Sequence, residues 1–209
     1  MYLYDTACHC IDTLITSKSF LTGEDSTMST VIPTPASDTS RGIDARADSR
    51  AFRDALGRYP TGVALITASS PGGPVGMAVN SFTSVSLAPP LISFCAMLTS
   101  NSWAGIRAAG SFAVSVLNEG HEPLARAFTR RDVDRFAGHT WQVSPGGHPV
   151  LAESLSWFDA TIQSVTVAGD HEVVIAQVHA CSAPQPGEPL VFYGGRYGNL
   201  AREGALAQA

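Results

Sequence analysis

Short strand-like segments, several of them strongly apolar, recur along most of the chain, and turns containing Gly or Pro separate these segments. The two longest segments are joined by the tight turn Ala168-Gly169-Asp170, which makes a hairpin and not a helical crossover. About seven strands connected in this way indicate a mainly β protein, an antiparallel β-barrel. Strands are expected at residues 63–67, 76–86, 91–96, 112–117, 155–167, 172–180 and 190–193.

Apolar residues spaced three to four apart predict a few short helices between the strands. The first is capped by Asp48-Ser49 and runs through Arg58, before Pro60 and Gly62. The second follows the run Ser100-Asn101-Ser102 and ends at Gly110. The third spans residues 121–128. An irregular connection is expected over residues 129–150.

Composition divides the chain into three parts. Residues 1–48 are rich in Ser, Thr, Asp and Pro and are predicted to form a disordered N-terminal extension. Residues 49–200 form the expected folded domain, and residues 201–209 a C-terminal tail. The single lysine of the chain and two of its four cysteines precede Met28. We therefore hypothesise that Met28 is the biological start and that residues 1–27 are an upstream extension, which intact-mass analysis would test.

Charge and hydropathy exclude several kinds of partner. The chain has 209 residues, 44% of them hydrophobic, and a formal net charge of -5 without a basic run. One globular domain is expected, and neither nucleic acid nor an anionic membrane is an expected partner. There is no apolar run of membrane-spanning length and no secretory signal, so a cytoplasmic location is expected.

The four cysteines do not suggest disulfides or a metal site. Cys95 and Cys181 lie in apolar strand-like sequence and are expected to be buried, reduced thiols. The run Cys8-His9-Cys10 is not followed by a second ligand pair, so no metal site is predicted.

Motifs of common enzyme classes are missing from the sequence. There is neither a G-x-S-x-G elbow nor an H-E-x-x-H helix. The glycine clusters at residues 72–76 and 194–198 lack the dinucleotide-binding spacing, and the first lies between two strands. A nicotinamide cofactor would therefore bind outside a Rossmann fold.

The stretch from Gly76 to Trp103, in which short polar side chains lie among apolar ones, gives the main indication of function. Residues 80–86 hold five small hydrogen-bonding side chains, which either contact a flat ligand ring or belong to a partly exposed edge strand. At Ser100-Asn101-Ser102 the helix start is either a phosphate site or an ordinary N-cap, and the local signal favours the cap. His171 follows a tight turn and is a proton donor, a carboxamide partner or a solvated turn residue.

Seven collinear motifs between about residues 50 and 200 resemble the flavin reductase family, the small reductases that supply reduced flavin to two-component monooxygenases. The matching segments are Tyr59-Pro60-Thr61-Gly62-Val63, Gly76-Met77-Ala78-Val79-Asn80-Ser81-Phe82-Thr83-Ser84, Pro89-Pro90-Leu91-Ile92-Ser93-Phe94, Asn101-Ser102-Trp103, Asp134-Arg135-Phe136-Ala137-Gly138, Gly169-Asp170-His171 and Pro189-Leu190-Val191-Phe192-Tyr193-Gly194-Gly195-Arg196-Tyr197.

The resemblance implies a split β-barrel of the FMN-binding type that forms a homodimer and binds FMN or FAD near the dimer interface. It also implies the residues of the site. The isoalloxazine ring is expected at Pro74, Val75, Gly76, Met77, Ala78, Asn80 and Ser81, the ribityl chain at Cys95, Ala96 and Met97, the phosphate at Asn101 and Ser102, and the nicotinamide at His171, Phe192, Tyr193 and Tyr197.

One departure from the family pattern concerns the phosphate. Many relatives place a basic residue in or just before the Asn-Ser run, or directly before the residue corresponding to Phe128. Here those positions are Ser100, Asn101 and Ala127, with Arg126 one residue further back. The phosphate charge is then neutralised by Arg126, by another group, or mostly by backbone donors.

The activity implied by the resemblance is hydride transfer from NADH or NADPH to FMN or FAD. Reduced flavin would then diffuse to a partner monooxygenase. His171 would orient the nicotinamide or assist proton delivery. Two alternatives remain: a non-catalytic flavin-binding or carrier protein with the same barrel, and a barrel that binds another phosphorylated ring.

Overall fold

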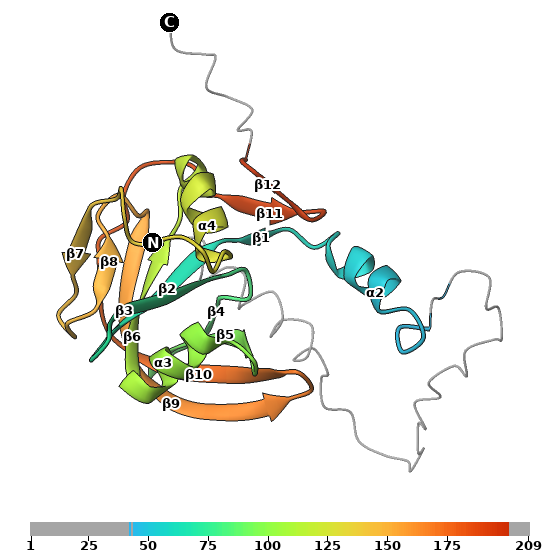
Figure 1. Cartoon of the computed structure of the whole chain (residues 1–209), viewed down its shortest axis with the longest axis horizontal. Helices are drawn as coiled ribbons and strands as arrows, with labels where there is room; N and C mark the ends of the chain where they lie inside the picture. The colour runs from blue at the N-terminus through green and yellow to red at the C-terminus, as the bar shows by residue number, and fades with distance from the viewer. Residues whose placement is uncertain (1–41, 43, 201–209) are drawn as a thin grey trace, which may run out of the picture. The chain divides into compact units, whose positions relative to one another are not determined.

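The computed structural model describes Gly42 and residues 44–200 (Figure 1). Its centre is a seven-stranded sheet in the order β3-β2-β6-β9-β10-β5-β4, in which every neighbouring pair is antiparallel. The sheet curls so that β3 also contacts β5. The antiparallel β prediction is therefore confirmed. The strands are β2 (Ala64–Ser70), β3 (Gly73–Val79), β4 (Thr83–Leu87), β5 (Pro90–Met97), β6 (Ser111–Val116), β9 (Ser156–Ala168) and β10 (His171–Cys181).

Two small sheets accompany the central one. The first joins β1 (Thr61–Gly62), β11 (Val191–Tyr193) and β12 (Arg196–Gly198). The second pairs β7 (Trp141–Val143) with β8 (Pro149–Leu151). This pair lies where an irregular connection was expected, and that expectation was wrong because a three-residue strand holds too few alternations to be recognised.

Three α-helices occur in the described residues, close to their predicted places. α2 (Ser49–Leu56) is capped by the Asp48 carboxylate, which accepts the backbone N–H groups of residues 50 and 51. It ends at Leu56, two residues before the predicted end at Arg58. α3 (Asn101–Ala109) ends at Gly110, whose φ of 73° is the left-handed conformation expected of a glycine C-cap. α4 (Glu122–Phe128) follows a short 3₁₀ turn.

The predicted strand over residues 76–86 is in fact two strands. β3 ends at Val79 and β4 begins at Thr83, and the two lie at opposite ends of the strand order. The Ser81 side chain explains the break. Its hydroxyl oxygen accepts the Cys95 N–H at 2.9 Å and its O–H donates to the Cys95 carbonyl at 3.3 Å, so a side chain replaces the backbone ladder at this point.

Aromatic side chains fill the core inside the curled sheet. Phe94 packs edge-on against Trp103 of α3 and Phe112 of β6, with ring centroids 5.7 and 5.3 Å apart. A second cluster joins Leu124 and Phe128 of α4 to Leu117 and Leu190. Trp103 is only 2% exposed and is therefore part of the core.

Not every prediction about burial holds. Cys95 and Cys181 are both free thiols, but Cys95 is half-buried and Cys181 is exposed at the end of β10, so burial was predicted wrongly. No described helix is long and apolar enough to cross a membrane. The predictions for residues 1–41 and 201–209, including Cys8, Cys10 and Met28, lie outside the described residues.

Two histidines are buried in a neutral form. His148 accepts the Ser69 N–H through Nδ1 at 3.2 Å, so its proton sits on Nε2, 2.8 Å from the Ser111 hydroxyl. This tautomer cannot deprotonate the serine, which removes the pair as a nucleophilic site. His121 likewise accepts the Asn118 N–H at Nδ1. Burial lowers the pKa of both imidazoles below the ordinary value of 6.5.

We predict that this burial makes the protein less stable in mild acid. Above pH 6.5 both states hold neutral histidines, whereas below it the unfolded chain takes up protons that the folded chain resists. The free energy of unfolding, measured with urea, should fall between pH 7.5 and 5.5 by up to about 1.4 kcal/mol per pH unit for each histidine. His148→Gln should flatten this slope and the exposed His179→Gln should not. An unfolding free energy independent of pH over this range would contradict the assignment.

Candidate functional site

A cleft of about 1360 Å³ opens beside the start of β10. One wall is the end of α2 with the segment leading into β1, another is the loop between β3 and β4, and a third is the β11–β12 turn. Four residues predicted for the site line this cleft together: Asn80, Ser81, His171 and Phe192. Tyr59, Thr61, Phe82 and Thr83 also line it.

His171 is held in place by its own turn. Its Nδ1 lies 2.7 Å from the Asp170 carboxylate, and the Asp170 carbonyl accepts the Leu98 N–H at 3.1 Å. The hydrogen bond from the imidazole lowers the pKa of Asp170, so this carboxylate is ionised and accepts the Nδ1 proton. Within the described chain Nε2 has no partner, which leaves this nitrogen for a ligand in the cleft.

The pairing of β5 with β10 brings the predicted ribityl strand against His171. Cys95, Ala96 and Met97 lie opposite residues 173, 172 and 171. Because side chains alternate along a strand, Ala96 faces the core, while Cys95 and Met97 lie on the more open side. Ser81 is bonded to Cys95, so the loop between β3 and β4 joins the same surface.

At the start of α3, the residue that caps the helix is not one of the residues whose N–H groups are available to a ligand. Ser100 provides the cap, since its hydroxyl oxygen accepts the Trp103 N–H at 3.2 Å. No acceptor within the described part of the chain meets the backbone N–H groups of Asn101 and Ser102. The Ser102 hydroxyl oxygen accepts a hydrogen bond from Arg135 Nη1 at 2.8 Å. The sequence motif contains Arg135, but 33 residues separate it from Ser102 and no local pattern indicated the contact.

The segment Pro74–Ala78 lies apart from the cleft. It runs along β3, paired with β2, and its Gly76 carbonyl accepts a second hydrogen bond from Arg135 Nη1 at 3.2 Å. Gly76 is required by packing, because a Cβ there would lie 2.7 Å from the Phe128 ring. This segment therefore lies at the end of the site marked by α3 and Arg135.

The two predicted tyrosines do not line the cleft. Tyr197 packs edge-on against Phe192 with ring centroids 5.3 Å apart, and burial raises its pKa. Tyr193 is exposed, with the Arg58 guanidinium 5.8 Å from its ring centroid. They support the β11–β12 hairpin, while its Phe192 contributes to the cleft wall.

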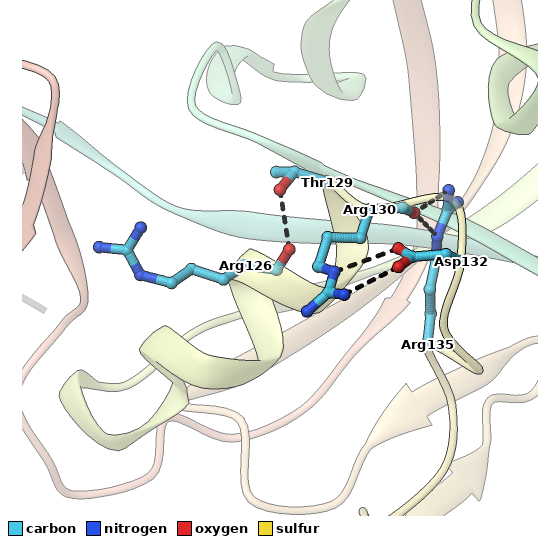
Figure 2. A network of polar contacts seen from close by, with 5 residues as sticks. All are labelled: Arg126, Thr129, Arg130, Asp132 and Arg135. Atoms are coloured by element: carbon cyan, nitrogen blue, oxygen red, sulfur yellow. Dashed lines mark hydrogen bonds and ion pairs between the residues drawn. The ribbon is translucent and has the colours of Figure 1, made fainter.

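Arg126 is already engaged elsewhere. Its guanidinium bonds the Glu122 carboxylate at 2.7–2.8 Å and lies 4.9 Å from the Tyr197 ring centroid. Figure 2 shows its side chain directed away from Arg135. Of the two arginines, Arg135 is the one at the start of α3.

The donors of the site fit a phosphorylated planar ligand. The cleft has Asn80, Ser81 and Phe192 on its walls, and the start of α3 adds N–H groups, a hydroxyl and a guanidinium. These donors suit an anion, and the larger cleft suits rings.

Comparison with known proteins agrees with this geometry. The family model named Flavin reductase like domain matches residues 56–201. The chain belongs to this family. It is 45% identical over 150 residues to the HsaB reductase subunit of a flavin-dependent monooxygenase from Rhodococcus jostii, covering 72% of this chain and 77% of that protein.

The names of two further relatives mention their cofactors. The FMN reductase (NADH) SmoA of Agrobacterium fabrum is 38% identical over 156 residues, 75% of this chain and 88% of that protein. The NADH:FAD oxidoreductase of Streptomyces globisporus, solved in complex with NAD and FAD fragments, is 33% identical with a TM-score of 0.72, covering 80% of this chain and 99% of that one. The split-barrel fold of this flavin reductase-like domain is thereby confirmed.

A buried carboxylate ties the two ends of the site together. Glu172, only 3% exposed, accepts the Trp103 indole N–H and an Arg107 Nη1 bond of 2.7 Å. It directly follows His171 in β10, and both of its partners belong to α3. Glu172 therefore fixes the start of α3 relative to His171.

We predict that Glu172→Gln destabilises the domain by about 1–3 kcal/mol, because it weakens a buried charge-assisted bond and leaves polar groups poorly paired. Glu153→Gln is the matched control. Its side chain is 73% exposed, so the change should stay below about 0.5 kcal/mol. Urea unfolding at pH 7.5 measures both, and equal effects would contradict a special role for Glu172.

Proposed function

We propose that this protein catalyses the NADH-dependent reduction of FMN or FAD and supplies reduced flavin to a partner monooxygenase. The observation that carries the proposal is the position of His171. It faces the same cleft as Asn80 and Ser81 and lies beside the strand that leads to the start of α3. Membership of the flavin reductase family supports it, as do relatives named as reductase subunits of monooxygenases.

The bound nicotinamide and flavin supply the hydride chemistry, and the protein supplies position and electrostatics. Asn80 and Ser81 present polar groups to the cleft from the loop between β3 and β4. Because Asp170 holds the Nδ1 proton of His171, the imidazole presents Nε2 to the cleft as an acceptor for a carboxamide N–H or, when protonated, as a donor. Phe192 provides an apolar wall for a flat ring.

Both flavins are candidate substrates. One relative is named an FMN reductase and another an NADH:FAD oxidoreductase, and both names contain NADH. A steady-state assay that crosses FMN and FAD with NADH and NADPH identifies the preferred pair.

We also propose that the protein is a homodimer, because α2 lacks an apolar partner within the described part of the chain. No residue of α2 is buried, and its apolar side leaves Phe52 and Leu56 exposed at 48% and 58%, followed by Tyr59 at 75%. An amphipathic helix of this kind needs a covering surface. α2 also lines the cleft, so a second copy packed on it would help to enclose the site.

The dimer proposal predicts that Leu56→Asp converts the protein to a monomer, since a charge would be buried in the interface. Sedimentation equilibrium measures the effect, expected to be a weakening of self-association by about 100-fold or more. Arg50→Asp introduces the same side chain on the polar side of α2 and should leave the dimer intact. A monomeric wild-type protein at micromolar concentration would overturn the proposal.

The activity is tested by NADH oxidation with and without added flavin. The wild-type protein should oxidise NADH only when FMN or FAD is present. His171→Ala should lower kcat/KM for NADH by about 10-fold or more, and Asp170→Asn by less, because it removes only the group that orients the imidazole. Flavin affinity should change less than about twofold in both variants, and His179→Ala, an exposed histidine, should match wild type.

Two results would contradict the proposal in different ways. Flavin binding without NADH or NADPH oxidation would indicate a carrier. Absence of flavin binding would indicate another ligand for the barrel.

A further inference from the structure

Arg135 is set apart from the other arginines of the described chain by its burial. It is the one arginine in residues 44–200 that is half-buried, whereas the others are exposed. Its guanidinium donates through Nε and Nη2 to the Arg130 carbonyl, and through Nη1 to the Gly76 carbonyl and the Ser102 hydroxyl oxygen. All three acceptors are neutral.

The nearby carboxylate is committed to another arginine. Asp132 pairs with both Nε and Nη2 of Arg130 at 3.2 and 2.9 Å, as Figure 2 shows, and these bonds lower the pKa of Asp132. Arg126 pairs with Glu122 and Arg107 with Glu172. Within the described residues no carboxylate pairs with Arg135.

The surroundings of Arg135 make this lack of a counter-charge costly. A helix carries partial positive charge at its N-terminus, and Ser102 stands in the first turn of α3. A partly desolvated guanidinium beside this helix end repels it, unless an anion lies between them. The arrangement therefore has a net positive potential directed at the place where Asn101 and Ser102 have unused N–H groups.

We propose that Arg135 is the phosphate-binding cation of the flavin site. This inference rests on the proposed flavin reductase function and deepens it. It assigns the positive charge at the start of α3 to a residue from the loop after α4.

Hydrogen-bond stoichiometry agrees with this role. A guanidinium has five N–H groups, and four of those of Arg135 are used by the three neutral acceptors, so one remains on Nη2. Because the Ser102 oxygen accepts from Arg135, its own O–H is available to donate. The phosphate would thus meet donors from the Arg135 guanidinium, the Ser102 hydroxyl and the backbone N–H groups of Asn101 and Ser102.

The loop of residues 130–135 fixes the position of the Arg135 guanidinium. The Arg130 carbonyl fixes one edge of Arg135, while the Arg130 side chain pairs with Asp132 in the same loop (Figure 2). A lysine at position 135 would keep the charge but lacks the planar fork that spans Arg130, Gly76 and Ser102. Arginine therefore suits position 135 through the planar geometry of its guanidinium as well as through its charge.

The test compares FMN with riboflavin, which has the same ring and ribityl chain but no phosphate. Affinities are measured by quenching of flavin fluorescence on titration with wild-type protein and with Arg135→Gln. The substitution should weaken FMN binding by about 10- to 100-fold, the loss of one or two charge-assisted hydrogen bonds, and riboflavin binding by less than about twofold. Salt should weaken FMN binding to wild type more than to Arg135→Gln.

Arg131→Gln is the matched control, since Arg131 is exposed, has no ion pair in the described residues and carries the same charge four positions away. It should leave both affinities within about twofold of wild type. Arg135→Lys should recover part of the FMN affinity. If Arg135→Gln fails to fold, Arg135→Lys and Ser102→Ala replace it, and each should weaken FMN selectively.

The outcomes separate this inference from the proposed function. An equal loss for FMN and riboflavin would show that Arg135 only supports the fold, and no loss for either would show that another group neutralises the phosphate. Both results overturn the inference but not the proposed function, because the wild-type protein still binds flavin. A wild-type protein that binds neither flavin contradicts the proposed function itself.

Discussion

The antiparallel pairing of β5 with β10 positions every part of the candidate site. It places Cys95–Met97 opposite Val173, Glu172 and His171, and the Asp170 carbonyl holds the residue that follows β5. The chain then turns directly into the start of α3, so this helix start and His171 are both positioned by the same strand pair. A slip of one residue in this register would turn His171 from the cleft to the core, because side chains alternate along a strand.

Side-chain hydrogen bonds connect segments of the site that the backbone hydrogen bonds of the sheet do not join. Ser81 bonds both backbone groups of Cys95 and so attaches the loop between β3 and β4 to β5. Glu172 joins β10 to α3 through Trp103 and Arg107. Both contacts link segments far apart in the sequence, and each satisfies polar groups that would otherwise be costly to bury. These contacts hold the site together on the side of α3 and His171, while one wall of the cleft comes from the α2 segment, which has no buried residue.

Much of the fold was predictable from periodicity. The β9–β10 hairpin, the cap at Asp48 and the glycine end of α3 follow from local patterns that depend only on neighbouring residues. The errors occurred where tertiary contacts override the pattern. Residues 76–86 were predicted to form one strand, but the Ser81 hydroxyl bonds the backbone of Cys95 and the strand is interrupted there. The β7–β8 pair was missed because strands this short have no period of their own.

The sequence by itself determined the antiparallel β class, the family and the short helix that begins at Asn101, since these depend on local spacing and on collinear motifs. Only the tertiary structure decided which cation lies at the start of α3. Arg126 was the nearer candidate in the sequence, but Glu122 one turn earlier neutralises it. Arg135 reaches Ser102 across 33 residues because the loop after α4 folds back on the start of α3. Electrostatic pairing depends on distance in space, which a linear pattern does not encode.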